Sequence, residues 1–108
     1  MGKGYDVNYK LNRYSDSLEL AAIVVEPISG RVLKAYTTEP GMQFYIPNSN
    51  MDYLAGHDDK KYGRYYGFCL EMQHFPDAPN NPQFPTTSLF PGEIYRQMTI
   101  YKFETISE

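Results

Sequence analysis

Proline and glycine punctuate this sequence at short intervals. There are eight of each in 108 residues, and Val, Ile, Tyr, Phe and Thr fill most of the stretches between them. Proline and glycine favour turns, whereas β-branched and aromatic residues favour strands, so the pattern predicts short strands joined by turns. A hydrophobic content of 42% and a charged content of 21% are typical of chains that fold. We therefore expect one all-β domain over residues 1–108, with antiparallel strands.

Most of the expected strands alternate apolar and polar residues, which gives each strand one core face and one polar face. The expected strands are 5–13, 18–26, 31–38, 42–46, 64–72 and 93–104. Segment 18–26 is apolar on both faces, so we expect it to be a central strand. A turn at 27–30 leads to its hairpin partner. The polar segment 47–63 and the proline-rich segment 75–92 are expected to be loops, the second anchored by Phe75, Phe84, Leu89 and Phe90.

Charge and apolar runs argue against several classes of partner. Ten Lys and Arg against thirteen Asp and Glu give a net charge of −3, which disfavours nucleic acid and anionic membranes as ligands. The aromatic and basic stretch 60–66 resembles a base-stacking surface, but Asp52, Asp58 and Asp59 nearly cancel its charge. The longest apolar run, around 21–25, is too short to span a bilayer, and the first ten residues lack the apolar region of a signal peptide. We expect no membrane contact and a cytoplasmic location.

Three expected strands carry an acid or an amide in the middle of their polar face: Asp6, Gln43 and Glu71. Half-buried strands ordinarily show polar residues to solvent, so the pattern alone favours a solvated face over a common pocket. Glu71 is the most unusual of the three, because it lies between Leu70 and Met72 and precedes an aromatic-rich loop. Partial desolvation there would raise its carboxyl pKa toward that of a general base.

The histidines and the cysteine suggest no metal site. His57 lies in a hydrophilic loop and is expected to be solvated, and His74 is expected to be structural rather than catalytic. Their spacing does not suit a shared metal, and the single Cys69, which we expect to pack, can form neither an intrachain disulfide nor a thiolate zinc site. We expect no metal and no organic cofactor.

Eleven tyrosines, together with scattered amides and carboxylates, suit a sugar better than a nucleic acid. A sugar presents apolar C–H faces to aromatic rings and hydroxyls to polar side chains. Tyrosine also favours strands for its own reasons, so this mixture alone leaves both interpretations open.

Several motifs, in order along nearly the whole chain, resemble the C-terminal part of the aldose 1-epimerases, or galactose mutarotases. The motifs are Gly4-Tyr5-Asp6-x-Asn8-Tyr9, Thr37-Thr38-Glu39-Pro40-Gly41-Met42-Gln43-Phe44-Tyr45, Gly67-Phe68-Cys69-Leu70-Glu71-x-Gln73-His74-Phe75-Pro76-Asp77, Pro82-x-Phe84-Pro85 and Pro91-Gly92-Glu93-x-Tyr95. The resemblance implies a segment of a large antiparallel β-sandwich. It also implies interconversion of the α and β anomers of a free aldose, with Glu71 as the general base and Asp6 and Gln43 as sugar ligands.

The chain also departs from the family pattern. Val7 replaces a family histidine, residues 46–48 differ from the usual Thr-Gly-Asn, and Met72 takes the place of a Thr after the catalytic Glu. Family members are about three times longer, and the resemblance implies that the general-acid His, a second His and a sugar-binding Arg lie upstream of this segment. A base without its acid forfeits roughly 10²- to 10⁴-fold in rate.

Two functions follow from the resemblance. The first is the base-bearing C-terminal segment of a mutarotase that acts on galactose or glucose and needs an upstream part for full activity. The alternative is a non-catalytic carbohydrate-binding or assembly module derived from that fold. In either case a sandwich segment should expose sheet edges, so we expect a homo-oligomer or a complementing upstream chain.

Overall fold

The computed structural model describes residues 4–49 and 51–106, with the side chains of 51–53 left out. The elements within these residues are β1 (Tyr5–Lys10), β2 (Glu19–Val25), β3 (Arg31–Thr37), β4 (Gly41–Ile46), β5 (Met51–Ala55), the 3-10 helix η1 (His57–Asp59), β6 (Lys61–Tyr62), β7 (Cys69–Gln73), the 3-10 helix η2 (Ala78–Asn80) and β8 (Thr99–Thr105). The expectation of an all-β chain is confirmed. Over the same residues, no helix has the length and apolarity needed to cross a membrane.

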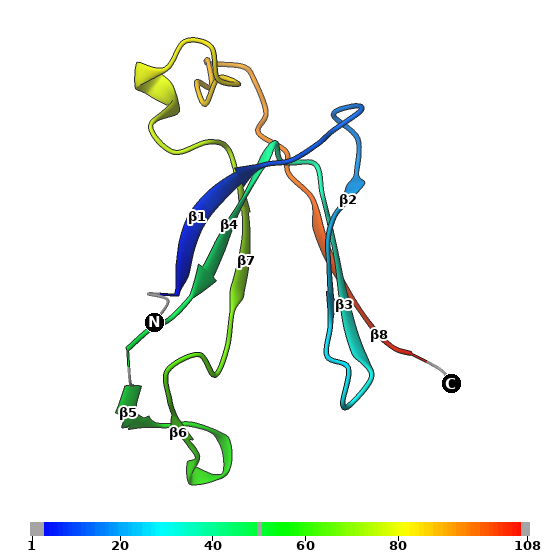
Figure 1. Cartoon of the computed structure of the whole chain (residues 1–108). Coiled ribbons are helices and arrows are strands. Elements are labelled where there is room, and N and C mark those ends of the chain that lie inside the picture. The colour runs from blue at the N-terminus through cyan, green and yellow to red at the C-terminus, as the bar shows by residue number, and fades with distance from the viewer. Residues whose placement is uncertain (1–3, 50, 107–108) are drawn as a thin grey trace.

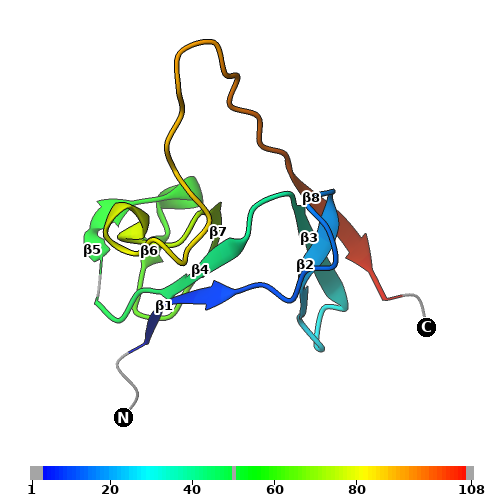
Figure 2. The same ribbon diagram turned by 90° about the horizontal axis from the view of Figure 1, so that it is seen from above.

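Two antiparallel three-stranded sheets face each other, with strand orders β1-β4-β7 and β2-β3-β8, and β5 and β6 form a separate small hairpin. The sheets approach each other at one end and diverge toward the other, as in an opened sandwich (Figure 1). Between η2 and β8 the chain makes a long excursion away from both sheets (Figure 2). The radius of gyration is 17.1 Å, whereas a compact domain of this length has about 13 Å. The architecture is therefore sandwich-like but open.

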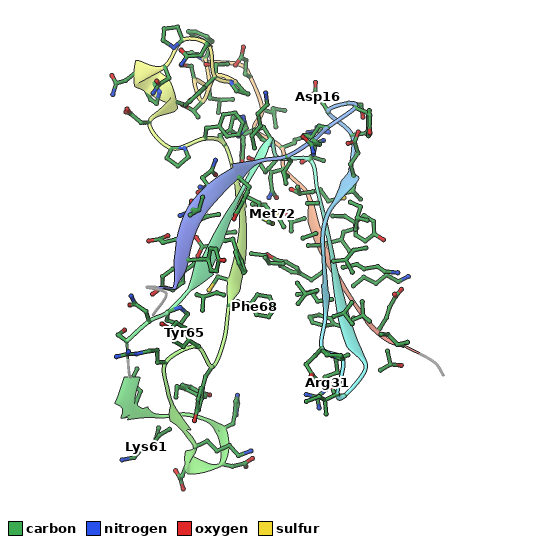
Figure 3. All side chains as sticks on the ribbon, viewed as in Figure 1. Asp16, Arg31, Lys61, Tyr65, Phe68 and Met72 are labelled. Atoms are coloured by element: carbon green, nitrogen blue, oxygen red, sulfur yellow. The ribbon has the colours of Figure 1, made fainter. Side chains whose placement is uncertain are left out.

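The core lies where the two sheets approach each other. Ala35 of β3, Met42 of β4 and Leu70 of β7 are buried together. Across this core, the Tyr101 hydroxyl on β8 donates a hydrogen bond of 2.5 Å to the Leu70 carbonyl. The labelled side chains of Met72, on β7, and of Phe68, just before this strand, point toward the second sheet (Figure 3). Beside the core, an open groove of about 460 Å³ is lined by Tyr9, Leu11, Leu20, Val24, Phe44 and Leu70, among others. Much of the inner apolar surface therefore remains uncovered in this chain.

The link between β3 and β4 joins the two sheets and is held by polar contacts. The Arg13 guanidinium donates hydrogen bonds to the carbonyls of Thr37 and Glu39, at 2.9 and 3.0 Å. Glu39 itself is 3% exposed, and its Oε2 lies 2.7 Å from Nδ1 of His74, the residue after β7. A buried carboxylate needs such a partner. His74 therefore ties the end of β7 to the joint between the sheets.

The β2–β3 hairpin has the predicted turn at Pro27–Gly30. Gly30 has a φ of +71°, and its N–H donates to the Glu26 carbonyl at 2.9 Å. Hydrogen bonds from Ser29 and Ile28 to the Glu26 carboxylate lower the pKa of that group. Glycine suits this position because a side chain is strained at positive φ.

The prediction that segment 18–26 is a central strand is wrong. In the structure β2 lies at the edge of its sheet and pairs only with β3, which is the central strand. Both faces of β2 are apolar, but Ile23 and Val25 on its outer face are about half exposed. A strand with two apolar faces therefore need not have two hydrogen-bonded neighbours, because side-chain polarity and backbone pairing are separate properties.

Several other expected boundaries also differ. The segment 47–63, expected to be a loop, contains the β5–β6 hairpin, and the strand expected over 64–72 begins only at Cys69. Tyr65 has a positive φ of 64°, which is incompatible with a regular strand. The strand expected over 93–104 begins at Thr99. In the proline-rich segment the Phe75 and Phe84 rings pack edge to face at 5.2 Å, as expected of anchors. Leu89 and Phe90 are exposed and do not anchor the segment.

An exposed ion-pair cluster on the β2-β3-β8 sheet gives a pH-dependent prediction. Lys102 and then Lys34 lower the pKa of Glu104 to about 2 from its ordinary value of 4.5. A depressed carboxyl pKa stabilises the fold above the unfolded-state pKa, and this contribution is lost as the pH falls toward the folded pKa. An NMR titration of the Glu104 carboxyl should therefore give a midpoint well below 4.5, and Lys102→Ala should raise it. A wild-type midpoint near 4.5 would contradict the ion-pair geometry.

Candidate functional site

The polar face of the β1-β4-β7 sheet carries all three residues singled out from the sequence. Cross-strand register places Asn8, Gln43 and Glu71 side by side on the three strands. Asp6 pairs with Tyr45 in the adjacent row. Residues directly opposite each other, and residues two apart on one strand, point to the same side of a sheet. Asp6, Gln43 and Glu71 therefore lie on one face, opposite the face that contributes Met42 and Leu70 to the core.

Hydrogen bonds connect this face across its strands. The Gln43 amide donates to Asp6 Oδ1 at 2.7 Å. The Gln73 amide donates to Asn8 Oδ1 at 3.0 Å and to Gln43 Oε1 at 3.3 Å. The Glu71 carboxylate receives no hydrogen bond from the described residues and is exposed. The face thus combines a fixed group of amides around Asp6 with a free carboxylate.

The expected environment of Glu71 differs from the observed one. We expected partial desolvation, but Glu71 is exposed, and the strand that carries it, β7, lies at the edge of its sheet. Asp6, Gln43 and Glu71 line none of five grooves found among the described residues. Within the described residues, the three groups form an open patch rather than a walled pocket.

Asn8 and Gln73 belong to this patch and were missed in the sequence analysis. Each lies two residues from a singled-out acid, Asn8 from Asp6 and Gln73 from Glu71, so strand alternation already places them on the same face. The signal was therefore present in the sequence. The sequence did not show how β1, β4 and β7 align with one another. The hydrogen bonds of Asn8 and Gln73 depend on this register.

Neither histidine lies on the polar face. His57 is exposed in η1, in keeping with the expected solvated loop. His74 follows Gln73 and contacts Glu39 at the joint between the sheets. Among the described residues, no three His, Cys, Asp or Glu side chains gather as metal ligands would. The polar face therefore offers a free carboxylate without a histidine beside it.

Cys69 does not pack as expected, because its thiol is exposed. It lies two residues before Glu71 and opposite Tyr45, so it shares the polar face of the edge strand β7. The expectation failed because a small apolar residue was assumed to be buried, whereas its position in the alternation places it with Glu71.

The exposed thiol can be tested chemically. We expect Cys69 to react fully with a chromogenic disulfide reagent in the folded chain, since an exposed thiol needs no unfolding to react. The reaction course should be similar with and without urea at equal pH. If the thiol reacted only after urea was added, Cys69 would be buried, and the face of β7 that carries it would be turned toward the core.

Comparison with known proteins bears on this arrangement. The sequence model of a family described as aldose 1-epimerase matches residues 1–102. Galactose mutarotase of Rattus norvegicus is 45% identical over 100 residues, which cover 93% of this chain and 29% of the relative. Galactose mutarotase of Homo sapiens gives the same identity and coverage. Aldose 1-epimerase of Escherichia coli strain K12 is 37% identical over 106 residues, which cover 94% of this chain and 30% of the relative. The chain thus spans less than a third of the length of these relatives.

Proposed function

This chain belongs to the aldose 1-epimerase family, and on that basis we propose that it is the base-bearing segment of a mutarotase that interconverts the α and β anomers of a free aldose such as galactose or glucose. One observation carries the proposal. Asp6, Gln43 and Glu71 come from three neighbouring strands and lie on one face, with the Glu71 carboxylate free of hydrogen bonds from the described residues.

The groups on this face suit the chemistry of anomer exchange. Mutarotation needs a base that takes the proton from the C1 hydroxyl and an acid that protonates the ring oxygen. The C1–ring oxygen bond then breaks, the aldehyde carbon rotates, and the ring closes on its other face. A free, exposed carboxylate at Glu71 is able to accept the C1 proton. The hydrogen-bonded pair of Asp6 and Gln43 offers an acceptor and a donor to the sugar hydroxyls beside it.

The acid comes from outside this segment in our proposal. Both histidines of the chain lie off the polar face, and His74 is engaged with Glu39. The proposal therefore requires the part of the mutarotase fold that this chain does not span. The open groove between the sheets and the large radius of gyration support the same requirement, because they leave apolar area for further strands to cover.

A second candidate function is carbohydrate binding without catalysis. The absence of a histidine from the polar face favours it, since Asp6 and Gln43 are suited to hold hydroxyls even where no acid completes the proton transfer. The two functions make different demands. Binding requires only that a sugar contact this face, whereas mutarotation also requires that Glu71 exchange a proton.

A chimera tests whether a sugar contacts this face. In it, this chain replaces the matching 100 residues of the rat galactose mutarotase. On titration with galactose, the NMR signals of the Gln43 side-chain amide should shift, because a bound hydroxyl replaces water beside it. Galactitol, which has no ring, is the control ligand and should shift them much less. A folded chimera whose Gln43 signals do not shift when galactose is added would contradict both candidate functions.

A further inference from the structure

We propose that Gln73 is a positioning residue that orients the Gln43 amide and, through it, Asp6, using the space left by Gly41. Its consequence for sugar binding rests on the proposed function. Its geometry rests on contacts among β1, β4 and β7 alone. Gln73 donates to Asn8 at 3.0 Å and to Gln43 at 3.3 Å, so one side-chain amide connects the two edge strands through the central one.

The crossing is possible because the register partner of Gln73 has no side chain. Gln73 pairs with Gly41 on β4. A Cβ built at Gly41 would lie 3.1 Å from Asn8 Oδ1 and 2.9 Å from a ring carbon of Phe75. Both distances are shorter than ordinary van der Waals contact. Any larger residue at position 41 would therefore press on the Phe75 ring and on Asn8 Oδ1, the acceptor that Gln73 reaches.

The contacts have a direction that fixes how Gln43 is presented. The Gln43 carbonyl accepts from Gln73, so its amide nitrogen is turned toward Asp6 and donates to Oδ1. An amide rotated by half a turn would present its NH₂ to Gln73 and its carbonyl to Asp6. The NH₂ groups of Gln43 and Gln73 would then face each other, and the Gln43 carbonyl would face the Asp6 carboxylate, so neither hydrogen bond would form. Asp6 Oδ2 receives no hydrogen bond from the described residues. Gln73 thus keeps one carboxylate oxygen of Asp6 engaged and the other open to a ligand.

Glu71 and Gln73 have separate roles on one strand. Glu71 and Gln73 both belong to β7 and share its polar face, but only Gln73 takes part in the hydrogen bonds among Asn8, Gln43 and Asp6. A neutral hydrogen bond contributes a factor of about five in an equilibrium constant. Loss of the Gln73 donor should therefore weaken sugar binding about fivefold through Gln43, without removing the base.

The first arm of the test uses the 108-residue chain without ligand. In the wild type, water exchange of the Gln43 side-chain amide should be slower than that of Gln83, which is exposed in the proline-rich segment. Gln73→Met and Gln73→Leu both remove the donor without adding an acceptor, and each should speed Gln43 exchange about fivefold. Gln83→Met is the matched control and should leave it unchanged. The proposal would be overturned if the wild-type Gln43 amide exchanged as fast as that of Gln83. It would also be overturned if neither substitution at Gln73 changed the exchange rate of Gln43.

The second arm uses the chimera and distinguishes positioning from general support. Gln73→Met should raise KM for galactose about fivefold with a smaller effect on kcat, and it should add little in a background that already carries Gln43→Ala. Additive effects of the two substitutions would overturn the positioning role. A chimera that is inactive in its wild-type form would instead overturn the proposed function, while the exchange measurement still decides whether Gln73 orients Gln43.

Discussion

Glu71→Gln in the chimera is expected to lower the mutarotation rate by about 10²- to 10⁴-fold, the range that a positioned base contributes. Glutamine keeps the shape of the side chain but cannot accept the C1 proton. Glu71 is exposed and receives no hydrogen bond from the described residues, so the substitution should leave stability within about 0.5 kcal/mol of wild type. Polarimetry from pure α-galactose measures the rate, and urea unfolding measures the stability.

The same substitution at another exposed glutamate provides the control. Glu93 lies in the proline-rich segment, far in sequence from the polar face, and accepts a hydrogen bond from the Phe90 N–H. Glu93→Gln in the chimera should leave the mutarotation rate unchanged. Equal rates for Glu71→Gln and Glu93→Gln would remove Glu71 from the chemistry and favour a non-catalytic carbohydrate-binding module.

Leu70→Ala is expected to destabilise the 108-residue chain by about 2 to 5 kcal/mol. Leu70 is 8% exposed and packs with Ala35 and Met42 in the small core between the sheets. Its carbonyl also accepts the hydrogen bond from Tyr101 on the opposite sheet. Truncation removes apolar contacts directly behind Glu71, so the sheets should separate at lower urea concentration. Circular dichroism during a urea titration gives the free energy of unfolding.

Leu89→Ala is the matched control for this loss of packing. Leu89 is 56% exposed in the proline-rich segment, and the same three-carbon truncation there should change the free energy of unfolding by no more than about 0.5 kcal/mol. A similar shift for both variants would show that the Ala35, Met42 and Leu70 cluster is not the centre of the fold.

Strand alternation predicted the faces of the first sheet well. It placed Asp6, Gln43 and Glu71 opposite the apolar residues of their strands, and the structure has them on one face of β1-β4-β7. Side-chain period is a local property of a strand, so it can be seen in the sequence. The resemblance to the aldose 1-epimerases, confirmed by the family match over residues 1–102, then supplied the roles proposed for these groups.

Properties that depend on neighbours were predicted less well. The edge position of β2, the exposure of Cys69 and the exposure of Glu71 all depend on whether another strand or loop covers a surface. Apolar content does not determine this. The hydrogen bonds of Gln73 were missed for a related reason, since they depend on a register that brings two edge strands together across Gly41.

Assembly remains a prediction of the open architecture. Four strands, β1, β2, β7 and β8, form the edges of the two larger sheets, and unpaired edges favour pairing with further strands. We expect light scattering to show an oligomer of the 108-residue chain at high concentration. A monodisperse monomer would instead mean that the loops shield these edges, and would favour the self-sufficient carbohydrate-binding module.

The mutarotation rate of the chimera is the most direct test of the claim that this chain carries a working base and sugar ligands. In the chimera, the rat enzyme supplies everything except the matching 100 residues, and this chain supplies Asp6, Gln43 and Glu71. Starting from pure α-galactose, polarimetry should show equilibration well above the spontaneous rate and dependent on chimera concentration. A folded chimera that binds galactose but leaves the spontaneous rate unchanged would contradict the account.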